Sequence, residues 1–138
     1  MNVVIIDYGA GNIQSIRFAL ARLGITAALS DDISIIKNAS HVIFPGVGEA
    51  SSAMEKLRAT KLDKLLPTLT QPVLGICLGM QLMCKHTEEG NTQGLGIFDT
   101  AVVRFETNLN VPHMLSLIHI SEPTRRRGIS YAVFCVKK

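Results

Sequence analysis

The sequence predicts one α/β domain, in which helices flank a mainly parallel β-sheet. Short apolar runs rich in β-branched residues alternate along the chain with stretches of helical periodicity. Turns that contain glycine follow three of these runs, at residues 8–12, 45–48 and 77–79. The chain has 138 residues, of which 47% are hydrophobic, and this is enough to form one compact core. Because sites in parallel sheets lie beyond the carboxyl ends of the strands, the three turns indicate where a functional site would form.

Four strands are expected before residue 77, because each apolar run is short and is bounded by turn residues. They occupy residues 2–7, 25–29, 41–44 and 72–76. Pro72 opens the last of them, at a position where the missing backbone N–H is tolerated. Two later strands are expected at residues 95–98 and 101–105, and an antiparallel pair is one arrangement for them.

Helices are expected between the strands. Ile13, Ile16 and Leu20 fall on one face of a helix that Gly24 would end. Residues 30–32 would cap a short helix that reaches residue 39. The remaining expected elements are a helix at residues 49–66 with a kink near Thr60, a helix at residues 78–86, and a polar turn at residues 87–94.

The charge is unevenly distributed along the chain. Residues 115–138 hold five basic residues and one acid, although the whole chain has a formal net charge of only +3. The near-neutral remainder gives no indication of binding to nucleic acid or to an anionic membrane surface. The N-terminus lacks the pattern of a signal peptide, no apolar run is long enough to span a bilayer, and the three cysteines follow no disulfide or zinc spacing. We therefore expect a cytoplasmic protein without a metal site.

The sharpest local feature is Cys77, which stands between Gly75 and Gly79 where an expected strand meets an expected helix. A G-x-C-x-G segment in this context is typical of a nucleophile elbow, a sharp turn that exposes the nucleophile above a sheet. The helix N-terminus would face the sulfur and favour the thiolate. The amide of Leu78 would point to where an oxyanion forms during acyl transfer. A buried structural cysteine in a tight turn is the alternative interpretation.

Two other glycine turns are candidates for a functional role. Residues 45–48, PGVG, follow the neighbouring strand and would supply another oxyanion amide, unless they only connect a strand to a helix. Gly9 and Gly11 begin a dinucleotide-binding fingerprint, but Gln14 stands where its third glycine is required. We therefore reject NAD binding and expect no cofactor.

No histidine can be assigned as the base that a thiol nucleophile requires. His86 would lie on the same expected helix as Cys77, about 13 Å along its axis. His41 begins a strand at the opposite end of the sheet, and the pattern does not place His113 or His119. All four are interpreted as surface or packing residues, as are Cys84 and Cys135.

Residues 72–82, PVLGICLGMQL, resemble the nucleophile segment of class I (triad-type) glutamine amidotransferases. Residues 2–12, 44–48 and 111–114 narrow the resemblance to the glutaminase subunits of imidazole glycerol phosphate synthase, an enzyme of histidine biosynthesis. The resemblance covers residues 1–114. It implies a Rossmann-like (flavodoxin-like) sheet that is incomplete at its C-terminal end.

The resemblance also implies a reaction. Cys77 would attack the side-chain amide of glutamine, form a glutamyl thioester and release ammonia. The implied oxyanion hole consists of the amides of Leu78, Gly46, Val47 and Gly48, and the residues implied to hold glutamine are Gly48, Gln81 and Glu89.

A partner follows from the same resemblance. Ammonia would pass to a β/α-barrel synthase subunit, which makes imidazole glycerol phosphate and an aminoimidazole carboxamide ribonucleotide. Asn12 would lie in the interface with this barrel.

The sequence departs from the family pattern after residue 114. The His-Pro-Glu segment that supplies the family's base and orienting carboxylate is absent here. We interpret residues 1–114 as the amidotransferase part and residues 115–138 as an artefactual tail, similar to translated sequencing-adapter read-through. Residues 129–136 are apolar and would either pair with an open sheet edge or promote aggregation. The 138-residue chain is therefore expected to have negligible glutaminase activity.

Three other interpretations stay open at this point. The chain could resemble the glutaminase of another synthase, such as that of pyridoxal phosphate. It could be a cysteine hydrolase or peptidase with a different substrate, although Gln81 argues against this. It could also be a degenerate domain that only docks on a partner. For the C-terminal segment alone, the arginines at residues 125–127 could form a basic interaction tail.

Overall fold

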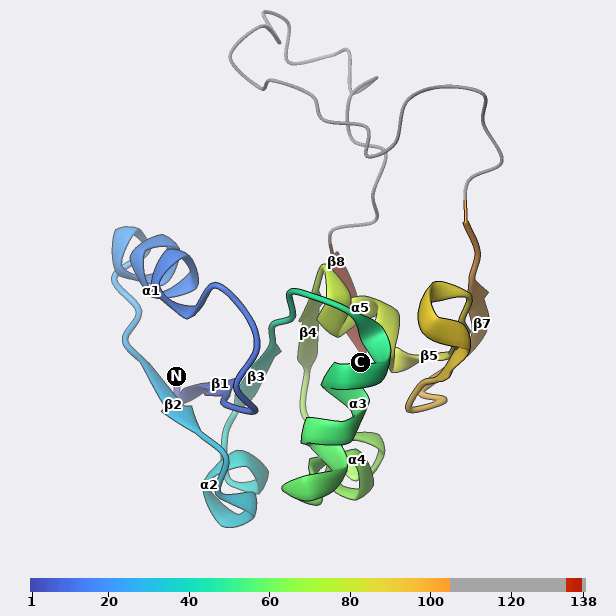
Figure 1. The fold of residues 1–138 in the computed structure, drawn as a ribbon. Coiled ribbons are helices and arrows are strands. Elements are labelled where there is room, and N and C mark those ends of the chain that lie inside the picture. Colours follow the sequence, from blue (N-terminus) through green and yellow to red (C-terminus); the bar gives the residue numbers. More distant parts are fainter. Residues whose placement is uncertain (105–133, 138) are drawn as a thin grey trace, which may run out of the picture.

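A five-stranded sheet forms the centre of the computed structural model, which describes residues 1–104 and 134–137 (Figure 1). Its strands lie in the order β2-β1-β3-β4-β8. The first four are parallel, and β8 is antiparallel to β4. This confirms the mainly parallel sheet that the sequence predicts. The strand bounds are β1 Val3–Ile6, β2 Ala27–Ser30, β3 His41–Phe44, β4 Val73–Ile76 and β8 Phe134–Lys137.

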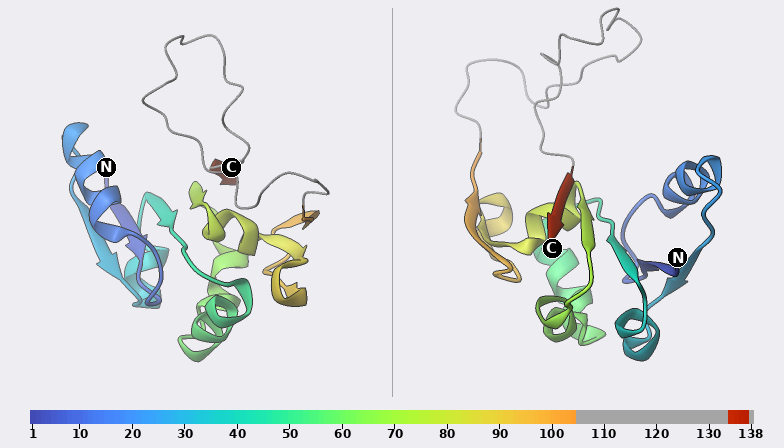
Figure 2. Two further views of the ribbon diagram at one scale, coloured as in Figure 1. Left: turned by 45° about the horizontal axis from the view of Figure 1, so that its top comes forward. Right: turned by 180° about the vertical axis from the view of Figure 1, so that it is seen from behind.

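Both faces of the sheet are covered, and β1 shows why its sequence is apolar throughout. Val4 and Ile6 belong to the larger hydrophobic cluster, whereas Val3 and Ile5 belong to the smaller one. Successive side chains of a strand point to opposite faces, so a strand that is buried on both sides has no polar position. Helix α1 (Ile13–Arg22) packs on the face of the smaller cluster, and the later helices pack on the other face (Figure 2).

The helix ends follow local signals, and those at Gly24 and residues 30–32 were expected. Asn12 accepts a hydrogen bond from the Ser15 N–H at the start of α1, and Gly24 follows its end at φ +71°. Helix α2 (Ile33–Lys37) begins at Asp32, whose carboxylate accepts from the N–H groups of the second and third helical residues. The expected kink near Thr60 is confirmed as a break, because Lys61 adopts φ +60°. The break separates α3 (Ala50–Ala59) from α4 (Leu62–Leu65), which continues into the 3-10 turn η1 (Leu66–Thr68).

The expected helix at residues 78–86 is wrong for its last three residues. Helix α5 (Leu78–Met83) is followed directly by strand β5 (Cys84–Thr87). In a continuing helix the Leu82 carbonyl would accept from the N–H of residue 86, but here it accepts from the Leu95 N–H at 2.7 Å. A partner distant in sequence therefore ends the helix. The helical distance between Cys77 and His86 no longer applies, because His86 lies on β5 opposite Gln93 and Ala101.

A second, three-stranded sheet lies beside α5. Strand β5 pairs antiparallel with β6 (Thr92–Gln93) and parallel with β7 (Phe98–Val102), and η2 (Glu89–Asn91) connects β5 to β6. The two strands expected at residues 95–98 and 101–105 are thus one strand in the described residues. Their suggested antiparallel pairing is wrong, because β7 pairs in parallel with a strand that the sequence does not predict.

The C-terminal region is described only at β8. Its register places residue 135 opposite Gly75, and residue 134 opposite Ile76. Of the apolar stretch at residues 129–136, the described part therefore pairs with the edge of the sheet. His113, His119 and the remainder of the segment proposed as a tail lie outside the described residues. Over the described ranges, no helix combines the length and apolar character that a membrane crossing requires.

Candidate active site

Cys77 lies at the carboxyl end of β4, where the chain turns sharply into α5. Its backbone has φ +53° and ψ −117°, a conformation that residues with a side chain rarely adopt. Such a conformation costs on the order of 1–3 kcal/mol, and it is found mainly where function requires it. The side chain is exposed, so the alternative of a buried structural cysteine is wrong. Cys84, by contrast, is buried and donates its thiol to the Met80 carbonyl.

The end of β3 lies directly against this turn. A β-carbon added to Gly79 would overlap the Phe44 carbonyl oxygen, and one added to Gly46 would come within 2.5 Å of the Gly79 amide nitrogen. Real β-carbons do not approach that closely, so both positions require glycine. The two glycines allow the loop at residues 45–48, called here the second glycine loop, to pack beside the elbow.

Two of the residues implied for an oxyanion hole lie next to the elbow, since Leu78 follows Cys77 directly and Gly46 packs against Leu78. Leu78 is the first residue of α5 and is buried, as is Gly46. Val47 is 53% exposed, and Gly48 has φ +96°. The sheet brings Leu78 and Gly46 together, and the role of the four amides in binding an oxyanion stays a prediction.

Tyr8, which the sequence analysis did not single out, also belongs to this site. It lies in the turn at residues 8–12, called here the first glycine loop, and is only 4% exposed. Its hydroxyl donates a hydrogen bond of 2.8 Å to the Pro45 carbonyl. Burial, and to a smaller extent the charge of Cys77, raise the pKa of Tyr8, so its hydroxyl stays a donor in neutral solution. The sequence signal that could have identified Tyr8 is its position directly after a predicted strand, at the edge of the sheet where sites form.

Gln81 and Glu89 line one open cavity of about 560 Å³, a volume within the range of ligand pockets. The Glu89 N–H donates to Thr87 Oγ1 at 3.2 Å, and this bond shapes the turn that carries Glu89. The Arg104 N–H donates to the carboxylate of Glu88 at 2.6 Å, which joins β7 to the same turn. Within the described part of the chain, Cys77 does not line this cavity, whose full lining is Gln81, Thr87, Glu88, Glu89, Val102, Val103 and Arg104.

Asn12 is exposed at the start of α1, where it caps the helix. This capping explains the residue locally, and its expected place in a partner interface stays a prediction. Gly11, just before it, packs against the second glycine loop, because an added β-carbon would lie 2.8 Å from that of Pro45.

The described histidines do not complete a catalytic pair. His41 begins β3, at the end of the sheet away from Cys77, and its ring contacts Ser40. His86 is on β5. Among residues 1–104, neither forms a hydrogen bond with the Cys77 thiol. No group of three potential metal ligands is found in the same residues.

Comparison with known proteins agrees with this geometry. A profile of the family described as "Glutamine amidotransferase class-I" matches residues 4–126. The chain belongs to the class-I glutamine amidotransferase family. Proteins named "Imidazole glycerol phosphate synthase subunit HisH" are similar in sequence. That of Bacteroides thetaiotaomicron is 53% identical over 117 residues, which are 83% of this chain and 60% of the relative. Those of Idiomarina loihiensis and Haemophilus influenzae are 47% and 44% identical over 115 residues, covering 83% of this chain and 59% and 58% of the relatives.

A solved amidotransferase supports the fold. The structure titled "Crystal structure of glutamine amidotransferase" matches with a TM-score of 0.64 at 23% identity, over 75% of this chain and 57% of that chain. The chain thus spans about 60% of the length of the curated relatives it matches.

Proposed function

We propose that this chain is the nucleophile-bearing part of a glutaminase that serves imidazole glycerol phosphate synthase in histidine biosynthesis. The observation that carries the proposal is the exposed Cys77, held at positive φ at the end of β4 beside the second glycine loop. This arrangement presents a sulfur to an acyl group at the edge of a parallel sheet, where such sheets form their sites.

The proposed reaction is acyl transfer to sulfur. The Cys77 Sγ bonds to the amide carbon of the glutamine side chain, and the carbonyl oxygen becomes an oxyanion. The amides of Leu78 and of the second glycine loop stabilise that oxyanion. The carbon–nitrogen bond then breaks, the nitrogen takes up a proton and leaves as ammonia, and water converts the glutamyl thioester to glutamate.

Substrate binding is proposed for the cavity beside α5, together with Gly48. Gln81 lies one turn along the helix from Cys77, and its N–H donates to the Cys77 carbonyl at 3.1 Å. The carboxylate of Glu89 is suited to the α-ammonium group of glutamine, and the Gln81 amide is suited to its polar groups.

We propose that the base comes from outside the described residues, because neither described histidine bonds to Cys77. We propose that the whole protein delivers ammonia to a β/α-barrel synthase subunit in the cytoplasm. The names of the relatives support only the part of this proposal that places the protein in a synthase of several subunits. Asn12 is the proposed contact residue.

Labelling with a glutamine analogue tests this proposal. The folded chain is incubated with a diazoketone analogue of glutamine, which alkylates a thiol once it is bound, and the modified peptide is identified by mass spectrometry. We expect modification at Cys77, protection by glutamine but not by asparagine, and no modification of Cys77→Ser. Equal labelling with and without glutamine would favour a cysteine hydrolase of other specificity, or a domain that only docks.

A further inference from the structure

The contact between Tyr8 and Pro45 links two loops that the chain separates by 37 positions. It is a buried hydrogen bond from a side-chain hydroxyl to a backbone carbonyl. The hydrophobic cluster does not require the hydroxyl, because a phenylalanine ring would fill the same space.

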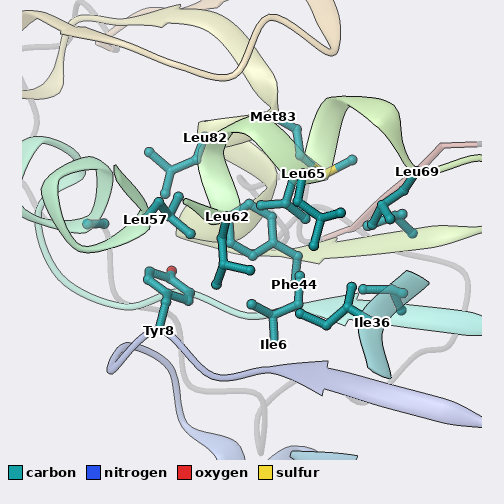
Figure 3. Packing of buried hydrophobic residues seen from close by; sticks show 14 of the residues in the cluster. Ile6, Tyr8, Ile36, Phe44, Leu57, Leu62, Leu65, Leu69, Leu82 and Met83 are labelled. Carbon is teal, nitrogen blue, oxygen red and sulfur yellow. The ribbon is translucent and has the colours of Figure 1, made fainter. Parts of the chain in front are cut away.

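The Tyr8 ring is held firmly in place. It lies in the larger hydrophobic cluster at the end of β1, near Leu57 and Phe44 (Figure 3). Its ring centroid is 5.5 Å from that of Phe44, with the planes inclined by 55°. A contact with helix α3 also holds the first glycine loop, since Lys56 Nζ donates to the Gly9 carbonyl at 3.0 Å.

The accepting carbonyl has a special position. The Pro45 C=O belongs to the same planar peptide unit as the Gly46 N–H, and the two groups point in opposite directions. Fixing the carbonyl therefore fixes the direction of that amide, and with it the direction in which the second glycine loop begins. The elbow also restricts the position of the second glycine loop, because Gly46 packs against Leu78 and Gly79.

We propose that Tyr8 is a positioning residue, whose hydroxyl orients the second glycine loop relative to Cys77. The contribution to catalysis rests on the proposed function, whereas the effect on the loop does not. Tyr8 touches neither the substrate nor the reacting atoms in this assignment. It acts through Pro45 alone.

Tyr8→Phe tests the proposal, because it keeps the ring and removes only the hydroxyl. Amide hydrogen exchange, followed by mass spectrometry in the full chain, should rise at residues 46–49 by about fivefold, the effect expected from losing one buried hydrogen bond. Exchange in β1 and β4 should stay unchanged. Thr68→Val is the matched control, since it removes another hydroxyl-to-carbonyl bond, of 2.7 Å to Leu65, remote from this site.

A second measurement separates positioning from stability. The rate of Cys77 modification by the diazoketone analogue is divided by its rate with iodoacetamide, which needs no binding site. The ratio should fall in Tyr8→Phe and not in Thr68→Val. An equal rise in exchange throughout the sheet, or no change at residues 46–49, would overturn the proposal. If the analogue fails to label the unmodified chain, the proposed glutaminase function fails, and hydrogen exchange alone decides the role of Tyr8.

Discussion

The carbonyl oxygen of Phe44 lies against the α-carbon of Gly79, in the space that a β-carbon would occupy. Through this contact the end of β3 is pressed onto the turn that carries Cys77. Backbone packing therefore holds the end of β3 beside the nucleophile.

We expect Gly79→Ala to destabilise the chain by about 3 kcal/mol, because the new methyl group meets backbone atoms that cannot rotate away. Urea unfolding followed by circular dichroism measures the change. Gly24→Ala is the control, since no atom lies within 4 Å of its added β-carbon. The left-handed backbone of Gly24 alone should cost about 1 kcal/mol. Similar losses in the two variants would show that the contact is relaxed in solution.

Glu49 gives a prediction for pH dependence. Hydrogen bonds from Ser51, and from the backbone at the start of α3, hold the pKa of this carboxyl below its ordinary value. Because the pKa is lower in the folded state, the ionised carboxylate stabilises the fold above the ordinary glutamate value of 4.5, and this contribution is lost as the pH falls further.

Glu49→Gln should therefore be less stable than the unmodified chain at neutral pH, and the difference should shrink as the pH falls below 4.5. Thermal unfolding across this range measures it. Glu55→Gln, on the same helix and without a hydrogen bond to its carboxylate in the described residues, is the control. A difference that is independent of pH would show that the capping bonds do not form in solution.

The 138-residue chain should release negligible glutamate from glutamine, even with a barrel synthase subunit added. A nucleophile without its base retains only residual catalysis. A coupled glutamate assay measures this, with Cys77→Ala as the blank. Robust release that Cys77→Ala abolishes would show that a histidine of this chain serves as the base.

Residues 115–138 are proposed to be foreign to the natural protein. The match of the family profile extends to residue 126, past the proposed boundary, so a direct test is needed. Sequencing the source DNA across codon 114 should show that the genomic reading frame continues differently. An uninterrupted genomic copy of residues 115–138 would refute this interpretation.

The local sequence alone predicted the parallel strands, because their buried residues form continuous apolar runs. It also predicted the helix cap at residues 30–32 and the helix end at Gly24, because both signals lie within a few residues. Cys77 was predicted to be the nucleophile because glycines flank it at the end of a strand, and the exposed elbow agrees with that prediction. Tertiary packing decided the features that depend on distant partners. The Leu82 carbonyl accepts a hydrogen bond from the Leu95 N–H, and residues 84–87 form a strand instead of continuing the helix. The Tyr8 hydroxyl donates to the Pro45 carbonyl, which follows a neighbouring strand. No local pattern encodes such bonds, because they form only when the sheet has brought separate segments of backbone into contact.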